Sequence, residues 1–464
     1  MAGSMGLAMQ ADPARGAGTA SAGAPGKTLT TGPNMAEYAA RRMGTVRIGV
    51  IGLGSRGSDA VRRLSRIPDA RIAGLGDLLG DRVGRAQAVL KDNGRPAARG
   101  FSGSEEAWKG ICDMDLDLVY IATPWRWHTP MAVHAMRSGK HAASEVPAAT
   151  TMEDCWNLVE TSEASRRHCM MLENTCYDFE ELATLNMVRH GVFGELVHAE
   201  GAYIHDLRDY MFDRQGYQGM WRLIENRDRN GNLYPTHGVG PISQCLNINR
   251  GDRYERLASL SSDDFMMGPR ARELSQADPF YRPFVSDRYR GQMNVTILRT
   301  VRGKSVMVQH DTTSPRPYSR IHLLSGTKGV VQKWPVLRLA FGEEWLKEEE
   351  ATKMFAEFEH PLARAVGDAA KKIGGHGGMD FIMDYRLLYC LKNGLPLDQN
   401  VYDAAAWSAI GPLSGKSVAA RSSSVEFPDF TRGRWKETAP LGIVEVDTGK
   451  LKVGIPADGD PSAA

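Results

Sequence analysis

The chain has 464 residues, enough for more than one hydrophobic core. Its 42% hydrophobic and 24% charged residues are typical of a globular protein, and its net charge of +2 gives no support for nucleic acid or an acidic membrane as partner. No apolar run approaches the ~20 residues of a membrane helix, and six scattered cysteines without a C-x-x-C pair indicate free buried thiols.

The first 44 residues differ from the rest of the chain. Residues 1–44 are rich in Gly, Ala, Ser, Thr and Pro without periodicity, which predicts a disordered tail or linker. The segment lacks the apolar stretch of an export signal, and Arg41-Arg42 precedes a strand and a glycine turn, unlike a twin-arginine signal. Location is therefore left open: periplasmic or secreted if a signal was removed upstream, and otherwise cytoplasmic.

A dinucleotide-binding pattern opens residues 45–173. The β-branched run Val46–Ile51 is followed by Gly52-x-Gly54-x-x-Gly57 and by an amphipathic stretch with apolar residues at helical spacing: Ala60, Val61, Leu64 and Ile67. Glycines at this spacing allow a tight turn, a close approach to a pyrophosphate and close packing of helix on strand. The helix N-terminus would then offer free N–H groups to the phosphates, with Ser55 and Arg56 beside them.

A second strand, "ARIAGLGD", ends at Asp77, about 20 residues beyond the last glycine, where an acid contacts the adenine ribose. An acid there favours NAD over NADP, because it would repel a 2′-phosphate. Arg82 nearby keeps NADP as the second choice. The alternative for Asp77 is a cap for the helix predicted to follow.

The alternation of strands and helices continues to residue 173. The segment "DLDLVYIATPWRWHTPMAVHAMRSGKHAASEVPAA" predicts a strand, a loop, a helix and a short strand, and Thr151 then caps another helix. The loop with Trp125 and His128 follows a strand's carboxyl end, where open α/β sheets bind ligands. These rings could wall a cofactor or simply pack the helix start. The pattern predicts a Rossmann domain with a doubly wound parallel sheet.

The pattern of predicted helices and strands changes over residues 174–425. A helix and a strand are followed by two pairs of strands joined at glycine turns, "MNVTILRTVRGKSVMVQHDTT" and "SRIHLLSGTKGVVQKW", and then by two helices. This pattern predicts an α+β domain for substrate binding, with a largely antiparallel sheet covered by helices on one face. The other face is expected to bury against a second copy, forming a homodimer. Residues 426–464 are rich in Pro and Gly, which predicts a segment that wraps the surface.

The stretch "NGNLYPTHGVGP", residues 230–241, is too broken for a helix and too rich in glycine for a strand, so we predict a loop. It carries Tyr234 and His237, two side chains that can handle protons, and loops often carry functional residues. On this stretch alone, a loop whose ring groups fill surface gaps is the favoured interpretation.

Two sets of motifs carry a family resemblance. "ATPWRWH", "HAMRSGKH" and "SEVP" resemble the nucleotide domain of the glucose-fructose oxidoreductase and inositol dehydrogenase (MocA-like) superfamily. Most members have lysine where this chain has Val146, which argues against an ordinary sugar dehydrogenase. "MLENTCY", "WRLIENRDRNGNLYPTHGVGP" and "TTSPRPYSR" resemble the NAD-dependent α-N-acetylgalactosaminidases of glycoside hydrolase family 109, from about Val46 to the last few tens of residues.

The resemblance implies site residues at matching positions. Besides the glycine turn, it assigns NAD contacts to Ser55, Arg56, Asp77, Trp125, Arg126, Trp127, His128, Glu145, Val146 and Asn174. It assigns sugar contacts to Tyr203, Arg222, Tyr234, Pro235, Thr236, His237 and Tyr318, with Tyr177 nearby. For Tyr203 and Tyr318, aromatic packing on the sheet is the alternative.

The resemblance also implies an unusual hydrolysis. NAD-dependent glycosidases are exceptions to the two-carboxylate rule, and no pattern of acids marks such a pair here. Transient oxidation at C3 would acidify the C2 proton, and elimination, water addition and re-reduction would then give hydrolysis with retention and a tightly bound NAD regenerated each turnover. His237 is the expected proton-transfer residue at C3, and Tyr234 and Tyr177 are candidates for proton exchange at C2 or for hydrogen bonding to the enolate, although these roles could be exchanged. A tyrosine would need a nearby cation, such as Arg222, to act as a tyrosinate.

Three hypotheses follow: an NAD-dependent glycosidase, an NAD(P)-dependent sugar or polyol oxidoreductase, and a silent NAD-binding protein. The expected partner is a glycan or small molecule ending in N-acetylgalactosamine. No metal is expected, because the acids and histidine of "HDLRD", residues 205–209, fit no zinc or iron spacing.

Overall fold

A six-stranded parallel sheet forms the first part of the protein. The computed structural model describes residues 32–454. The strands run in the order β3-β2-β1-β4-β5-β6, with every pair parallel. Their bounds are β1 Val46–Ile51, β2 Ala70–Gly76, β3 Arg99–Phe101, β4 Leu118–Ile121, β5 His141–Ser144 and β6 Cys169–Met171. The doubly wound sheet predicted from the sequence is confirmed.

Helices connect these strands. They are α1 Ser55–Leu64, α2 Gly80–Asp92, α3 Lys109–Cys112, η1 Trp125–Trp127, α4 His128–Arg137 and α5 Met152–Ser165. Four of them, α1, α2, α4 and α5, lie where the sequence predicts. The Thr151 hydroxyl accepts from the Asp154 N–H at 3.1 Å, the cap expected for α5. Asp77 is not the cap of α2, since Leu79 takes that position.

An eight-stranded, largely antiparallel sheet forms the second part. Its order is β13-β12-β11-β7-β10-β9-β8-β14. Within this sheet, β7 and β10 are the one pair of described strands that run parallel. The bounds are β7 Leu196–Ile204, β8 Tyr254–Ser261, β9 Asn294–Thr300, β10 Ser305–Asp311, β11 Leu323–Gly326, β12 Val330–Gln332, β13 Arg338–Ala340 and β14 Val425–Glu426.

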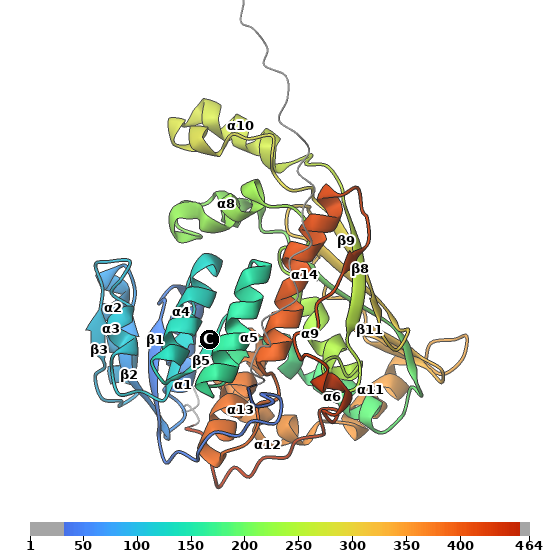
Figure 1. The fold of residues 1–464 in the computed structure, drawn as a ribbon, viewed down its shortest axis with the longest axis horizontal. Coiled ribbons are helices and arrows are strands. Elements are labelled where there is room, and N and C mark those ends of the chain that lie inside the picture. The colour runs from blue at the N-terminus through green and yellow to red at the C-terminus, as the bar shows by residue number, and fades with distance from the viewer. Residues whose placement is uncertain (1–31, 455–464) are drawn as a thin grey trace, which may run out of the picture. The chain divides into compact units, whose positions relative to one another are not determined.

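The helices of the second part tie the two sheets together. They are η2 Asn174–Tyr177, α6 Phe179–Arg189, α7 Arg208–Phe212, η3 Gln218–Met220, α8 Trp221–Asp228, α9 Thr236–Cys245, α10 Met267–Ala277, η4 Pro279–Phe284, α11 Glu348–Glu357, α12 Pro361–Ile373, η5 His376–Gly378, α13 Met379–Asn393, α14 Val401–Ala419 and η6 Arg434–Lys436. Helix α14 lies beside α5 (Figure 1), and α13 packs on α1. Both sheets therefore belong to one compact unit that begins at Pro33.

Helix α9 corrects the prediction of a loop over residues 230–241. It begins at Thr236 and contains His237 in its first turn. Its glycines serve close packing: a Cβ on Gly238 would lie 2.4 Å from the Ala202 nitrogen and 2.8 Å from the Gly201 carbonyl carbon. The segment therefore follows helical geometry despite its poor helix propensity, because only a helix without side chains on this face can press against β7.

The packed part of the chain begins before the boundary at residue 44 that composition predicts. Residues 34–43 form no helix or strand, yet Met35 is 1% exposed and its backbone N–H donates to the Tyr402 hydroxyl at 3.3 Å. At the other end, the Leu451 carbonyl accepts from Tyr385 at 2.9 Å. The rest of the predicted tail, residues 1–31, and residues 455–464 of the predicted wrapping segment lie outside the described residues.

The six cysteines are buried and free, as predicted. Between residues 32 and 454, no helix is both long and apolar enough to cross a bilayer.

Candidate functional site

A cavity of about 830 Å³ lies along the carboxyl ends of β1, β2, β4 and β5 and extends to the end of β7 and the start of α9. This is the edge at which open α/β sheets bind their ligands. The segment 207–224, with α7, η3 and α8, supplies much of the remaining lining. One continuous cavity thus joins the glycine turn to the Tyr-His segment.

The structure brings most of the predicted site residues to this cavity. Those that line it are Gly52, Gly54, Ser55, Arg56, Asp77, Trp125, Arg126, Trp127, His128, Glu145, Val146, Asn174, Tyr203, Arg222, Tyr234 and His237. Those that do not line it are Gly57, Tyr177, Pro235, Thr236 and Tyr318.

The turn after β1 is built as the glycine spacing predicts. A Cβ on Gly57 would lie 1.7 Å from the Gly52 carbonyl oxygen, so only glycine lets α1 start this close to the strand. Asp77 holds the turn from the neighbouring strand, since its carboxylate accepts from the Leu53 N–H at 2.7 Å and from the Leu79 N–H at 2.9 Å. Arg82 lies 3.5 Å from the same carboxylate.

Charges at the floor of the cavity are paired. The Arg56 guanidinium donates to Glu145 at 2.7 Å and to Asp380 at 2.6 Å. Asp380 lies in α13 and also accepts from the Asn174 amide at 2.5 Å. These bonds join the glycine turn, the loop after β5 and a helix from the far end of the sequence. Val146, where the superfamily resemblance expects lysine, is buried beside them.

Aromatic rings surround a buried arginine at the other end. The rings of Trp125 and Tyr234 stack at 5.5 Å, and the Arg222 guanidinium lies 4.9 Å from the Tyr234 ring centre. Arg222 is 7% exposed and donates to the Tyr217 hydroxyl at 2.9 Å, while its Nε has no partner. No carboxylate in residues 32–454 forms an ion pair with it, so its positive charge stays available to oxygen atoms in the cavity.

Burial decides the protonation of the tyrosines here. It raises the pKa of Tyr203 to about 12 and that of Tyr234 well above the ordinary tyrosine value, although Arg222 acts in the opposite direction. Both rings therefore carry their protons at neutral pH and can donate hydrogen bonds. The hypothesis that Tyr234 removes a proton from C2 as a tyrosinate finds no support in this environment.

His237 meets both tyrosine rings, with centroids 5.1 Å from Tyr203 and 4.9 Å from Tyr234. Its Nδ1 lies 2.6 Å from an oxygen of Glu173, which leaves Nε2 as the free ring nitrogen. Glu173 was not among the predicted site residues, although it directly precedes Asn174 after β6, a position that could have marked it. Asp380, by contrast, carries no local signal, because helix α13 brings it to the site.

Several predicted site residues lie elsewhere. The Tyr177 hydroxyl lies 3.4 Å from Asp398, and its side chain is buried outside the cavity, so the prediction that it exchanges protons with the sugar loses its geometric basis. Tyr318 packs edge-on against His205 and Tyr203, the aromatic alternative considered for it. Pro235 and Thr236 form the start of α9 behind His237. His205, which belongs to the segment whose spacing fits no zinc or iron site, also lines the cavity.

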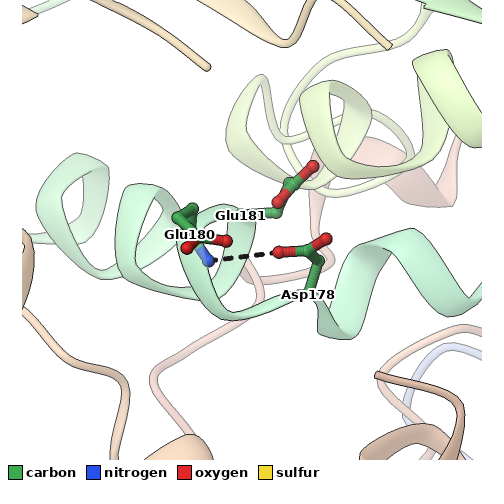
Figure 2. A group of neighbouring side chains, drawn as sticks. All are labelled: Asp178, Glu180 and Glu181. Carbon is green, nitrogen blue, oxygen red and sulfur yellow. Dashed lines mark hydrogen bonds between the residues drawn. The ribbon is translucent and has the colours of Figure 1, made fainter. Parts of the chain in front are cut away.

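An acidic cluster near η2 is neutralised by the protein itself. Figure 2 shows Asp178, Glu180 and Glu181, with the Glu180 N–H donating to Asp178 at 3.4 Å. Lys333 Nζ lies 2.6 Å from Asp178 and 2.8 Å from Glu181, and Arg320 lies 2.6 Å from each. Burial alone would raise the pKa of the Asp178 carboxyl, but the two cations hold it well below its usual range. The cluster is therefore an ion-pair network rather than a ready metal centre.

Family models match both parts of the chain. The C-terminal domain of glycosyl hydrolase 109 matches residues 177–437, and the NAD-binding Rossmann fold of an oxidoreductase family matches residues 46–173. The boundary between the two matches falls within the segment that carries Glu173 and Asn174.

Curated relatives agree over most of the chain. A glycosyl hydrolase family 109 protein of Shewanella pealeana is 45% identical over 91% of this chain and 94% of its own length. One from Solibacter usitatus is 46% identical over 88% and 93%, and one from Phocaeicola vulgatus is 45% identical over 87% and 99%.

Solved structures share the fold at low identity. A levoglucosan dehydrogenase in complex with NADH has a TM-score of 0.60 and 17% identity, covering 83% of this chain and all of that one. The aldose-aldose oxidoreductase of Caulobacter crescentus has a TM-score of 0.58 and 16% identity, covering 82% of this chain and 99% of that one.

Proposed function

Because this chain belongs to glycosyl hydrolase family 109, we propose that it removes terminal α-linked N-acetylgalactosamine, with NAD tightly bound and regenerated at each turnover and with retention of configuration. The observation that carries the proposal is the single cavity lined both by the dinucleotide turn and by His237, Tyr203, Tyr234 and Arg222. A pure binding protein has no need for this second group of side chains.

The residues present fit a dinucleotide. Gly54 and Ser55 put the N-terminus of α1 at the cavity, where its free N–H groups suit a pyrophosphate. The Asp77 carboxylate lies at the end of β2, where ribose hydroxyls are bound in this fold. Asn174 adds a buried Oδ1 that has no hydrogen-bond partner in the described residues, an acceptor free for a ligand amide.

When bound, NAD supplies a reversible hydride acceptor for the sugar. Removing hydride from a carbon requires that the proton of its hydroxyl go to a base, and we assign that role to His237, which lines the cavity and whose Nδ1 is engaged by Glu173. Tyr203 and Tyr234, which keep their protons, donate hydrogen bonds to sugar oxygens. The proton of the C–H next to the carbonyl that forms must pass to a base, and Arg222 stabilises the negative charge that then develops on the carbonyl oxygen.

The carboxylates at the cavity do not form the pair that an ordinary glycosidase needs. Among the described residues, three carboxylates line the cavity: Glu145 is bound by Arg56, Asp77 accepts two backbone N–H groups, and Glu105 lies 3.6 Å from Arg126. All three lie toward the cofactor turn and have partners, which supports a route through proton removal instead.

A sugar or polyol dehydrogenase is the second candidate, because levoglucosan dehydrogenase shares the fold. Val146 weighs against it: an apolar side chain cannot supply the amine that this superfamily resemblance expects beside the reacting hydroxyl.

One assay separates the candidates. The purified protein is incubated with p-nitrophenyl α-N-acetylgalactosaminide without added cofactor. Release of nitrophenol without accumulation of NADH is expected. Accumulation of NADH only when NAD⁺ and free sugar are supplied would instead support the dehydrogenase, and the absence of both signals would leave a binding protein.

Hydrolysis in deuterated water tests the chemistry. Proton loss and return at C2 predicts deuterium at that carbon in the released sugar, as read by mass spectrometry and NMR. A product without the label would rule out the proposed route, because direct displacement at C1 does not touch the C2–H bond.

A further inference from the structure

Glu173 is the one carboxylate in residues 32–454 that contacts His237. Its Oε1 lies 2.6 Å from His237 Nδ1 and also accepts from the Thr175 N–H at 3.1 Å. Glu173 lies just after β6 and caps η2, whereas His237 lies in the first turn of α9. The contact therefore joins the last strand of the parallel sheet to the helix that packs on the second sheet.

The environment keeps Glu173 charged although it is fully buried. Burial by itself would raise the pKa of its carboxyl, but the charge of His237 and the hydrogen bonds from His237 and Thr175 lower it below the usual range. No lysine or arginine of the described chain pairs with it, and His237 Nδ1 is the one ring nitrogen of these residues that contacts its carboxylate. A buried carboxylate that is bonded to one imidazole fixes the orientation of that ring.

The backbone around His237 is held by the same group of residues. Pro241 lies four residues further along α9 and has no N–H, so it cannot donate to the His237 carbonyl as a normal helical residue would. The Thr175 hydroxyl lies 3.0 Å from that carbonyl and 2.8 Å from Glu173 Oε1. Glu173 is itself fixed by Gln399, whose amide donates to the Glu173 carbonyl at 2.8 Å.

We propose that Glu173 is the positioning residue of His237: it binds the proton on Nδ1, fixes the tautomer and leaves Nε2 bare toward the cavity as the base for the sugar hydroxyl. The role of His237 as a base for the sugar rests on the proposed function, whereas the assignment of its tautomer does not. An Nε2–H tautomer could not accept a proton from the sugar, so the choice of ring nitrogen decides whether His237 can act.

Other titratable groups around the pair are Tyr203 and Tyr234, whose rings contact His237, and Tyr318, Cys176, His205 and Arg222. Burial raises the pKa of the three tyrosines and of the cysteine, so they stay neutral near pH 7. Burial and Arg222 lower the pKa of His205. A His205→Asn variant therefore serves as a control that removes the neighbouring imidazole and leaves the contact between Glu173 and His237 in place.

The tautomer can be read without any substrate. In the full-length protein labelled with ¹⁵N-histidine, the His237 signals are those lost in His237→Asn. We expect an Nδ1–H signal and an unprotonated Nε2 in the wild type, and a change toward Nε2–H in Glu173→Gln. A wild-type Nε2–H tautomer would overturn the assignment, whatever reaction the protein performs.

Kinetics test the consequence. For Glu173→Gln we expect kcat to fall by on the order of 10²-fold while KM and the bound NAD stay close to wild type, because the carboxylate acts through His237. A substrate deuterated at C3 should show a larger isotope effect in this variant.

Matched variants test whether a loss of activity in Glu173→Gln follows from disturbed packing alone. Glu163→Gln removes a buried carboxylate that accepts from Tyr402 far from the cavity, and it should keep full activity. Thr175→Val should lower kcat by less than Glu173→Gln, and Thr175→Ser should restore it. Wild-type kcat in Glu173→Gln would refute the positioning role, whereas a wild-type protein inactive on the glycoside would refute the proposed function only.

Discussion

The two ends of the cavity are built differently. At the cofactor end, every charged group has a partner: Arg56 binds Glu145 and Asp380, and Asp77 accepts two backbone N–H groups. At the sugar end, Arg222 has no carboxylate partner in the described chain, and its neighbours include the protonated hydroxyls of Tyr203 and Tyr234 and two histidines, His205 and His237.

This difference indicates that the cofactor end is a rigid binding site. The sugar end can instead stabilise negative charge that forms during a reaction. The paired charges at the cofactor end fix the glycine turn, and a bound ligand adds little further electrostatic stabilisation to them. A buried cation without a counter-charge is costly, and an anion that forms beside it is stabilised in proportion. The predictions below test this division, from the largest expected effect to the smallest.

Replacing His237 should separate the two ends most clearly. For His237→Asn we expect kcat to fall by about 10²–10⁴-fold, the usual contribution of a general base. Bound NAD, measured by release after denaturation, should be unchanged because His237 lies at the sugar end. Loss of NAD together with activity would show that the ends are not independent.

Arg222 should affect turnover through its charge. Removing a donor that faces developing negative charge costs about 10²-fold in kcat, so a fall of that order is expected for Arg222→Gln. The matched control is Arg227→Gln in the same helix, where the arginine pairs with Asp228 near the surface. Equal losses in both variants would point to a disturbed helix α8 rather than to a lost charge.

Asp77 should affect cofactor choice and not the sugar chemistry. Asp77→Asn keeps the size of the side chain and removes its charge. We expect the preference for NAD over NADP to weaken by about tenfold, because one hydrogen bond to a charged group contributes about that factor to binding. Equilibration with both cofactors followed by mass spectrometry measures the ratio. An unchanged ratio would assign selectivity to Arg82 or another neighbour.

The outer face of the eight-stranded sheet carries apolar side chains, with Leu260 65% and Ile297 56% exposed on β8 and β9. We propose that this face pairs with a second copy of the chain, away from both ends of the cavity. Chromatography with light scattering should show a dimer, and Ile297→Glu should give monomers that keep their NAD. A wild-type monomer would remove this proposal.

Chelation should have the smallest effect. Lys333 and Arg320 occupy the positions that a cation would take among Asp178, Glu180 and Glu181. Exhaustive treatment with a chelator is therefore expected to leave activity at its initial level. Activity lost on chelation and restored by one metal would show that a metal site lies elsewhere.

The cofactor end was largely predictable because its signals are local. The glycine spacing, the strand that ends at Asp77 and the loop with Trp125 each lie within one βα unit, and a parallel sheet brings its carboxyl ends to a common edge. The family motifs added the sugar-contacting residues, of which Tyr203, Arg222, Tyr234 and His237 reach the cavity.

The helix that carries His237 was not predictable from local pattern. Its glycines and proline argue against a helix, and they are tolerated because Gly238 lies against Gly201 of β7 and Thr175 supplies the donor that Pro241 lacks. Tyr177 was proposed from a family motif, and only the fold shows that its hydroxyl lies 3.4 Å from Asp398 and that it does not line the cavity.

The sequence by itself determined the two sheets, the nucleotide edge and the residue types that meet there, because hydrophobic period and glycine spacing act over short stretches of chain. Only the tertiary structure decided which groups face one another: Glu173 with His237, Asp380 with Arg56, and Arg222 with no acid. Those choices depend on burial and on contacts between segments far apart in the chain, and burial sets which side chains keep their protons.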